Sequence, residues 1–134
     1  MRLSKIAAAA VMLTAAAVLP VVTASPAAAA TPQCVLSLYH QNNYVPGNTN
    51  LSPNCVMGVG AVGNHVSTLQ SSLNNCYRKG LAVDREFGPK TRDALKQVQS
   101  SLGIPADGVY GPQTARAMQH TIVAGGGACD RITF

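Results

Sequence analysis

The sequence has little of what enzymes and nucleic-acid-binding proteins depend on. Its 134 residues include no tryptophan, two phenylalanines and four tyrosines, and only 11% of them are charged. None of the histidines is spaced from another histidine, aspartate or glutamate as metal ligands are, and neither an HExxH string nor a nucleophile elbow occurs. His40, His65 and His120 are therefore expected to be surface or capping residues. We predict a protein that is not an enzyme and that uses no metal or cofactor.

The positive charge is small and scattered. The chain carries ten Lys and Arg against five Asp and Glu, a formal net charge of +5. Removing Arg2 and Lys5 with a leader sequence would lower this to +3. The remaining charges are spread over residues 78–131, whereas a nucleic-acid-binding surface gathers them on one face. A nucleic-acid partner is not expected.

Residues 1–30 are typical of a secretory signal peptide. Arg2 and Lys5 form a short positive start, residues 6–22 are almost entirely apolar, and three alanines precede Thr31 as a small-residue cleavage site. The apolar run is shorter than the roughly 20 residues that a membrane-spanning helix needs, so a membrane anchor is the less favoured alternative. We expect a secreted protein with no membrane span after cleavage.

All four cysteines follow the expected cleavage site, at Cys34, Cys55, Cys76 and Cys129. An even number of cysteines in a small exported chain predicts two disulfides, and the absence of a CxxC pair disfavours zinc. Three pairings are possible. We favour Cys34–Cys55, which closes an N-terminal loop, and Cys76–Cys129, which ties the end of the chain to the rest.

The most informative feature is an internal repeat. DREFGPKTRDAL from Asp84 aligns without gaps with DGVYGPQTARAM from Asp107, and LQSSL or VQSSL precedes each copy. The aspartate can accept hydrogen bonds from its own turn, and the proline after the glycine can begin a helix. Phe87 or Tyr110 supplies apolar surface to a core without tryptophan. The turn-forming positions are Asp84, Gly88, Pro89, Asp107, Gly108, Gly111 and Pro112.

Three helices are expected. Apolar residues recur at intervals of three and four between residues 62 and 77, which predicts an amphipathic helix with Asn64 as its cap and Gly80 as its stop. Pro89 and Pro112 are expected to begin the second and third helices.

These patterns divide the chain into a signal peptide (residues 1–30), an irregular disulfide-closed extension (31–63) and a helical domain with a C-terminal tail (64–134). The extension is rich in Asn, Pro, Gly and Ser, and only VLSLY within it could form a strand. The predicted fold class is all-α: a compact three-helix bundle with two repeated turn–helix units and a disulfide-tied N-terminal extension.

The string DREFGPKT followed by VQSSLGIPADGVYGPQT resembles the peptidoglycan-binding domain family, whose members are small three-helix modules that target the cell wall. The resemblance covers roughly residues 64–119. Two positions differ from the family pattern: Arg85 replaces the glycine of the first turn, and Val98 stands where an aromatic residue is usual. The resemblance implies a secreted, non-catalytic module that binds bacterial peptidoglycan through its glycan strand or its stem peptide.

The repeated turns are the expected place of ligand contact. Helix N-termini behind the two Gly-Pro turns favour carboxylates, which stem peptides carry, and threonine hydroxyls in the first helical turn can serve the exposed N–H groups. The candidate ligand-binding residues are Arg85, Phe87, Lys90, Thr91, Tyr110, Gln113 and Thr114.

Two other functions stay open at this stage. A small disulfide-stabilised secreted protein could be an inhibitor or interaction protein that presents the loop at residues 39–53 to a protein partner. The chain could also be the accessory part of a wall hydrolase. The sequence predicts no oligomeric state.

Overall fold

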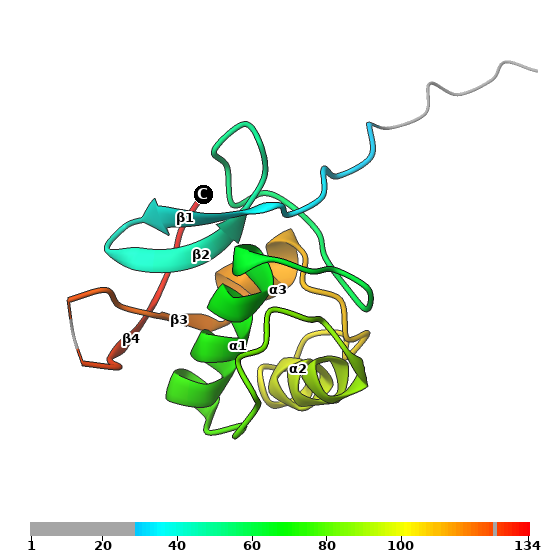
Figure 1. Cartoon of the computed structure of the whole chain (residues 1–134), viewed down its shortest axis with the longest axis vertical. Helices are drawn as coiled ribbons and strands as arrows, with labels where there is room; N and C mark the ends of the chain where they lie inside the picture. Colours follow the sequence, from blue (N-terminus) through cyan, green and yellow to red (C-terminus); the bar gives the residue numbers. More distant parts are fainter. Residues whose placement is uncertain (1–28, 125) are drawn as a thin grey trace, which may run out of the picture.

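A computed structural model describes residues 29–124 and 126–134, so the predicted signal peptide lies outside the described residues apart from its last two positions. Three helices and four short strands are present in the part of the chain that is described (Figure 1). In chain order they are β1 (Leu36–His40), β2 (Asn43–Gly47), α1 (Asn64–Tyr77), α2 (Pro89–Ser101), α3 (Pro112–Ala117), β3 (Gln119–Thr121) and β4 (Cys129–Arg131). None of the described helices is long and apolar enough to cross a membrane.

The predicted all-α fold class is wrong, because the three helices share the structure with two antiparallel strand pairs. Strands β1 and β2 form a hairpin within the stretch that was expected to be irregular. Its two-residue turn, Gln41 and Asn42, has φ angles of 48° and 64°, and two successive left-handed residues produce the twist that joins short antiparallel strands. The asparagine-rich sequence that indicated a loop is therefore the turn of a hairpin.

The second strand pair explains why the molecule is not a compact helical bundle. Helix α3 ends at Ala117 after six residues, and the chain continues as β3, which pairs with β4 from Gln119 opposite Arg131 to Thr121 opposite Cys129. The segment expected as a C-terminal tail is thus a returning strand. Figure 1 shows α1 at the centre, with the β1–β2 hairpin at one end and β3 beside it.

Helix α1 begins and ends close to the predicted limits, but with different caps. Gly63 is its N-cap residue and Asn64 is already its first helical residue, with no side-chain cap hydrogen bond. The helix ends before Arg78, which has a left-handed φ of 55°, two residues ahead of Gly80. A left-handed residue at this point lets its backbone N–H bond the last free carbonyl groups of the helix.

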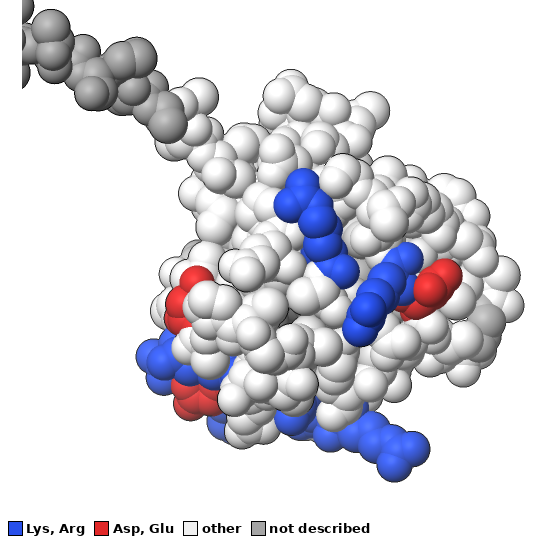
Figure 2. All heavy atoms as spheres, turned by 180° about the vertical axis from the view of Figure 1, so that it is seen from behind, with Lys and Arg blue, Asp and Glu red and all other residues white. Residues whose placement is uncertain are grey.

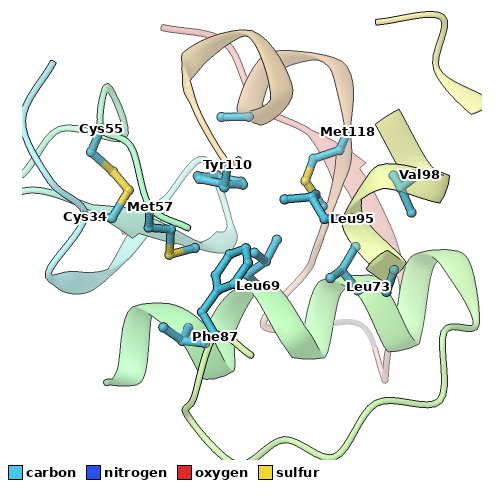
Figure 3. Packing of buried hydrophobic residues seen from close by; sticks show 13 residues of the cluster. Cys34, Cys55, Met57, Leu69, Leu73, Phe87, Leu95, Val98, Tyr110 and Met118 are labelled. Carbon is cyan, nitrogen blue, oxygen red and sulfur yellow. A yellow bond between two sulfur atoms is a disulfide. The ribbon is translucent and has the colours of Figure 1, made fainter. Parts of the chain in front are cut away.

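The core gathers side chains from the helices, from the repeated turns and from the segments around the first disulfide. Tyr110 and Phe87 from the repeated turns, Met57 from the segment before α1 and Leu69 and Leu95 from the helices are each 2% exposed or less. They lie within one cluster of buried residues (Figure 3). The repeated turns therefore contribute to folding as much as the helices do.

Residues 57–63 connect the hairpin region to α1 and lie beside both repeated turns. Met57 and Tyr110 exchange two backbone hydrogen bonds of 2.9 Å each, and the N–H of Phe87 donates to the carbonyl oxygen of Ala61 at 2.9 Å. Because one backbone segment pairs with both copies of the turn, the position of each copy relative to the other is fixed.

The disulfide pairing that the sequence favoured is confirmed. Cys34 is bonded to Cys55 and Cys76 to Cys129, with Cα–Cα distances of 5.0 and 5.7 Å. The first bond lies in the core cluster and closes the hairpin region. The second joins the last turn of α1 to the start of β4.

Candidate functional site

Each repeated turn is built around a buried glutamine that the preceding helix supplies. In the first copy this is Gln70, which is 1% exposed. Its Nε2 donates to Asp84 Oδ1 at 2.8 Å, to the carbonyl oxygen of Glu86 at 3.0 Å and to Thr91 Oγ1 at 3.2 Å. Its Oε1 accepts the backbone N–H of Arg85 at 3.1 Å.

The second copy repeats this network bond for bond. Gln99 is also 1% exposed. Its Nε2 donates to Asp107 Oδ1 at 2.8 Å, to the carbonyl oxygen of Val109 at 2.9 Å and to Thr114 Oγ1 at 3.0 Å. Its Oε1 accepts the N–H of Gly108 at 2.9 Å. The two networks hold their turns in the same conformation.

Gln70 and Gln99 are not among the candidate residues predicted from sequence. The signal was present, because Gln70 and Gln99 occupy the same place in LQSSL and VQSSL. Each satisfies several polar groups of its turn that would otherwise be buried without partners, which is costly.

The aspartates and threonines of the turns take part in the same networks. Asp84 and Asp107 accept the N–H of the residue two positions on, at 3.0 and 2.9 Å. The side-chain hydrogen bond from Gln70, followed by the N–H of Glu86, lowers the pKa of Asp84, so it remains a carboxylate. Thr91 Oγ1 accepts a hydrogen bond from the Gln70 side chain, whereas a role in capping the helix was expected.

Arg85 adopts the left-handed conformation that its counterpart Gly108 adopts, with φ of 68° against 72°. The surroundings of the two residues differ. A Cβ atom at Gly108 would lie 2.6 Å from Cγ of Arg92 and 3.2 Å from Cγ of Lys96. The second turn therefore requires glycine for space as well as for backbone conformation, whereas the first turn accommodates an exposed arginine.

The candidate ligand-binding residues fall into a buried set and an exposed set. Phe87, Thr91, Tyr110 and Thr114 are between 0% and 4% exposed, and both aromatic side chains lie among the buried residues (Figure 3). The exposed set comprises Arg85, Lys90 and Gln113.

A groove lies at the start of α2. One part of about 340 Å³ is bordered by Gln70, the first turn and the first residues of the helix, and an adjoining part of about 380 Å³ extends toward Lys79 and Asp93. Lys90 borders both parts. We call these two parts together the α2 groove. It combines the ammonium groups of the two lysines with carboxylates from Asp84, Glu86 and Asp93.

Donors for an anion are available in the α2 groove. The N-cap residue of α2, Gly88, forms no side-chain cap hydrogen bond, and no acidic residue occupies the first turn of the helix. The backbone N–H groups of Lys90 and Thr91 therefore lack a partner within the helix. Helix α3 also begins at a Gly-Pro pair, but its six residues are too few to add a comparable dipole.

Two of the three histidines are buried, contrary to the surface role expected from sequence. His120 is 0% exposed, and its Nε2 lies 2.9 Å from the carbonyl oxygen of Ala115. Burial lowers its pKa to about 4, only partly opposed by that hydrogen bond. Burial also lowers the pKa of His65. Both rings are neutral at physiological pH, and neither lies at the α2 groove.

The described residues place no three His, Cys, Asp or Glu side chains where they could hold a metal ion. Charged side chains are also dispersed. Figure 2 shows Lys and Arg side chains standing apart on one face, with much uncharged surface between them.

Residues 62–118 match the peptidoglycan binding domain family. This segment, which holds both repeated turns and both glutamine networks, belongs to the peptidoglycan-binding domain family.

Several known proteins are similar to part of the chain. The N-acetylmuramoyl-L-alanine amidase CwlM of Mycobacterium tuberculosis is 40% identical over 62 residues, which are 46% of this chain and 15% of that protein. The zinc D-Ala-D-Ala carboxypeptidase of Streptomyces albus G is 50% identical over 34 residues, 25% of this chain and 13% of the carboxypeptidase. The chain thus spans less than a fifth of either enzyme. The crystal structure of the SleB N-terminal domain is 39% identical, with 46% of this chain and 84% of that chain covered and a TM-score of 0.44.

Proposed function

We propose that the protein is a secreted, non-catalytic module that binds bacterial cell-wall peptidoglycan. The observation that carries this proposal is the family match over residues 62–118, which includes both complete copies of the turn. The two disulfides support a location outside the reducing cytoplasm.

We further propose that the α2 groove receives the stem peptide. Stem peptides carry carboxylates, and the free N–H groups at the start of α2 together with the Lys90 ammonium group suit a carboxylate. Asp84 and Glu86 border the same groove and suit an amine. A groove with both signs of charge fits a peptide end that also has both.

Of the candidate ligand-binding residues, Arg85, Lys90 and Gln113 are the proposed contacts, because their side chains are exposed. Phe87 and Tyr110 instead hold the turns against the core, and Thr91 and Thr114 hold the glutamines. The ligand would therefore meet a surface whose shape is fixed by the buried set.

The proposal of a non-catalytic role is supported by the positions of the ionisable side chains. His65 and His120 are buried away from the α2 groove, and Asp84 is engaged in its turn. The matched segment is also a small share of the two enzymes named above. A zymogram with embedded cell walls is expected to show no cleared band.

Binding is tested by co-sedimentation of the disulfide-bonded protein with purified peptidoglycan sacculi, with cellulose as the control solid. We expect enrichment on sacculi and a loss of about tenfold in affinity for Lys90→Glu, equivalent to about 1.4 kcal/mol. A glutamate in the first turn of a helix stabilises the helix, so this loss would not reflect unfolding.

Lys96→Glu is the matched control, because Lys96 is exposed on the same helix and does not border the α2 groove. It makes the same change in net charge. The proposed site would be contradicted if both variants lost affinity equally, and the proposed function if the parent protein showed no enrichment above cellulose.

A further inference from the structure

A second groove, of about 570 Å³, lies between α1 and the two strand pairs. Helix α1 contributes one face to it. The other walls come from strands β1, β2 and β3, from the connection between β3 and β4, and from Val83. We call it the α1 groove. Its floor on the helix consists of Asn64, Ser67, Thr68, Ser71 and Asn75.

These floor residues form a polar stripe. Their spacing of three and four positions places them on one side of a helix, and that side is turned toward the strand pairs. Thr68 is buried, and Ser67 and Ser71 are half-buried. A helix face this close to other elements is ordinarily apolar. Here the Ser67 and Thr68 hydroxyls each donate to the carbonyl oxygen of Asn64 at 2.9 Å.

No charged residue lines the α1 groove among the described residues, although the whole chain has ten Lys and Arg and five Asp and Glu. The polar groups that line it are all hydroxyls, amides or backbone. Hydroxyl and amide groups can donate as well as accept hydrogen bonds. An ionic ligand would lose water in the groove without gaining an opposite charge.

Some of these polar groups join the walls and others are left free for a ligand. Ser37 Oγ lies 2.7 Å from Thr68 Oγ1, which joins β1 to the helix, and Asn75 Nδ2 donates to Thr121 Oγ1 at 3.3 Å, which joins the helix to β3. By contrast, the Ser71 hydroxyl makes no hydrogen bond to any other described residue. The walls are thus tied together while the middle of the floor stays available.

An aromatic ring stands at the border of the α1 groove. Tyr44 lines it and is 47% exposed. Its cross-strand neighbour Tyr39 lies edge-on to it, with 6.2 Å between the two ring centroids. Tyr39 is itself 65% exposed but does not line the groove. A tyrosine so placed offers an apolar ring and a polar hydroxyl to a ligand.

We propose that the α1 groove binds an uncharged glycan chain. Sugar rings present hydroxyls that match a lining of donors and acceptors, and their C–H faces can pack against the Tyr44 ring. The floor from Asn64 to Asn75 is about 16 Å long at 1.5 Å per residue, which suits a short oligosaccharide.

This inference extends beyond the proposed peptidoglycan function, since much of the α1 groove lies outside the matched residues 62–118. Ser37 and Tyr44 precede that segment, and Thr121 follows it. Binding of glycan at the α1 groove and binding of stem peptide at the α2 groove can therefore be tested, and can fail, separately.

The experiment is an NMR titration of the disulfide-bonded protein with chitotetraose, an uncharged N-acetylated oligosaccharide. We expect amide shifts at residues of the α1 groove, and an affinity loss of about tenfold for Tyr44→Ala. Tyr39→Ala is the matched control, because it removes the same cross-strand contact without touching the groove. It should bind within about twofold of the parent, which is close to the precision of such an affinity.

The internal repeat supplies a second matched pair. Ser71→Arg places a long charged side chain on the groove floor and is expected to abolish binding. Its counterpart in the repeat, Ser100→Arg, lies exposed on α2 and should have no effect. The proposal is overturned if chitotetraose causes no shifts in the groove, or if each control variant loses as much affinity as its partner. Retention of sacculus binding by Ser71→Arg would leave the α2 groove assignment intact.

Discussion

Gln70 and Gln99 each serve several polar groups that the turns cannot satisfy alone. Substitution of such a residue removes several hydrogen bonds at once, and the groups that were bonded to it stay in the protein without a partner. The energetic cost is therefore set by the groups left behind.

We predict that Gln99→Leu lowers the free energy of unfolding by about 2–4 kcal/mol, because the N–H of Gly108 and the hydroxyl of Thr114 lose their partner. Urea denaturation followed by circular dichroism measures this. The matched control is Gln97→Leu, an exposed glutamine on the same helix, which should change stability by less than about 0.5 kcal/mol. Equal effects of the two substitutions would falsify the structural role of Gln99.

Arg85 and Gly108 occupy the same position in the two copies of the turn, but substitutions of these two residues are expected to change stability in opposite directions. Arg85→Gly is expected to stabilise the protein by about 0.5 kcal/mol. Glycine removes the cost of about 1–2 kcal/mol that a left-handed non-glycine residue carries. Part of this gain is offset, because glycine also gives the unfolded chain more conformational entropy. Gly108→Ala is expected to destabilise it by about 1–3 kcal/mol, through both the backbone conformation and the contact with Arg92. Thermal unfolding of the two variants should therefore shift in opposite directions, and a shift in the same direction would contradict this account.

His120 makes stability depend on pH. Its pKa is about 4 in the folded protein, against about 6.5 when unfolded. The unfolded chain therefore binds the extra proton first, so the stabilisation is complete above pH 6.5 and is lost as the pH falls toward 4. The lost amount is about 3 kcal/mol.

Unfolding measured between pH 7 and pH 4 should show this loss, and His120→Gln should reduce the slope. His65 acts in the same direction because its pKa is also lowered, so some slope should remain in the variant. An NMR titration in which His120 protonates near pH 6.5 would contradict the buried, neutral ring.

At the scale of elements, the helices and strand β1, which overlaps VLSLY, could be anticipated from sequence, and the other three strands could not. The three-and-four spacing of apolar residues marked α1, and Pro89 and Pro112 marked the first residues of α2 and α3. Strand β2 has the sequence NYVPG, whose asparagine, proline and glycine are typical of a loop. Its residues also do not alternate between buried and exposed. Strands β3 and β4 have three residues each, too few to show a period.

The candidate site was also predictable only in part. Sequence located both turns, but the division into buried and exposed residues depends on contacts between distant segments. Tyr110 is buried because Met57, far away in the sequence, pairs with its backbone. The role of Gln70 likewise depends on a turn that begins 14 residues later. Patterns within a short stretch of sequence do not reveal contacts between segments that are far apart in the chain.

At the scale of the whole molecule, helix α1 separates two surfaces of different chemistry. Gln70 borders the charged α2 groove, and the next residue, Ser71, borders the uncharged α1 groove. On the segment after the helix, Ala82 and Asp84 line the α2 groove, and Val83 lines the α1 groove. Residues 81–84 thus form the ridge between the two grooves.

The bond between Cys76 and Cys129 bears on resistance to proteases. The connection between β3 and β4 is exposed at Val123, Ala124 and residues 126–128, and exposed connections are where proteases cut. A single cut there would not release the C-terminal piece, because the disulfide still joins it to α1. Proteolysis at this exposed connection would therefore nick the protein without taking it apart.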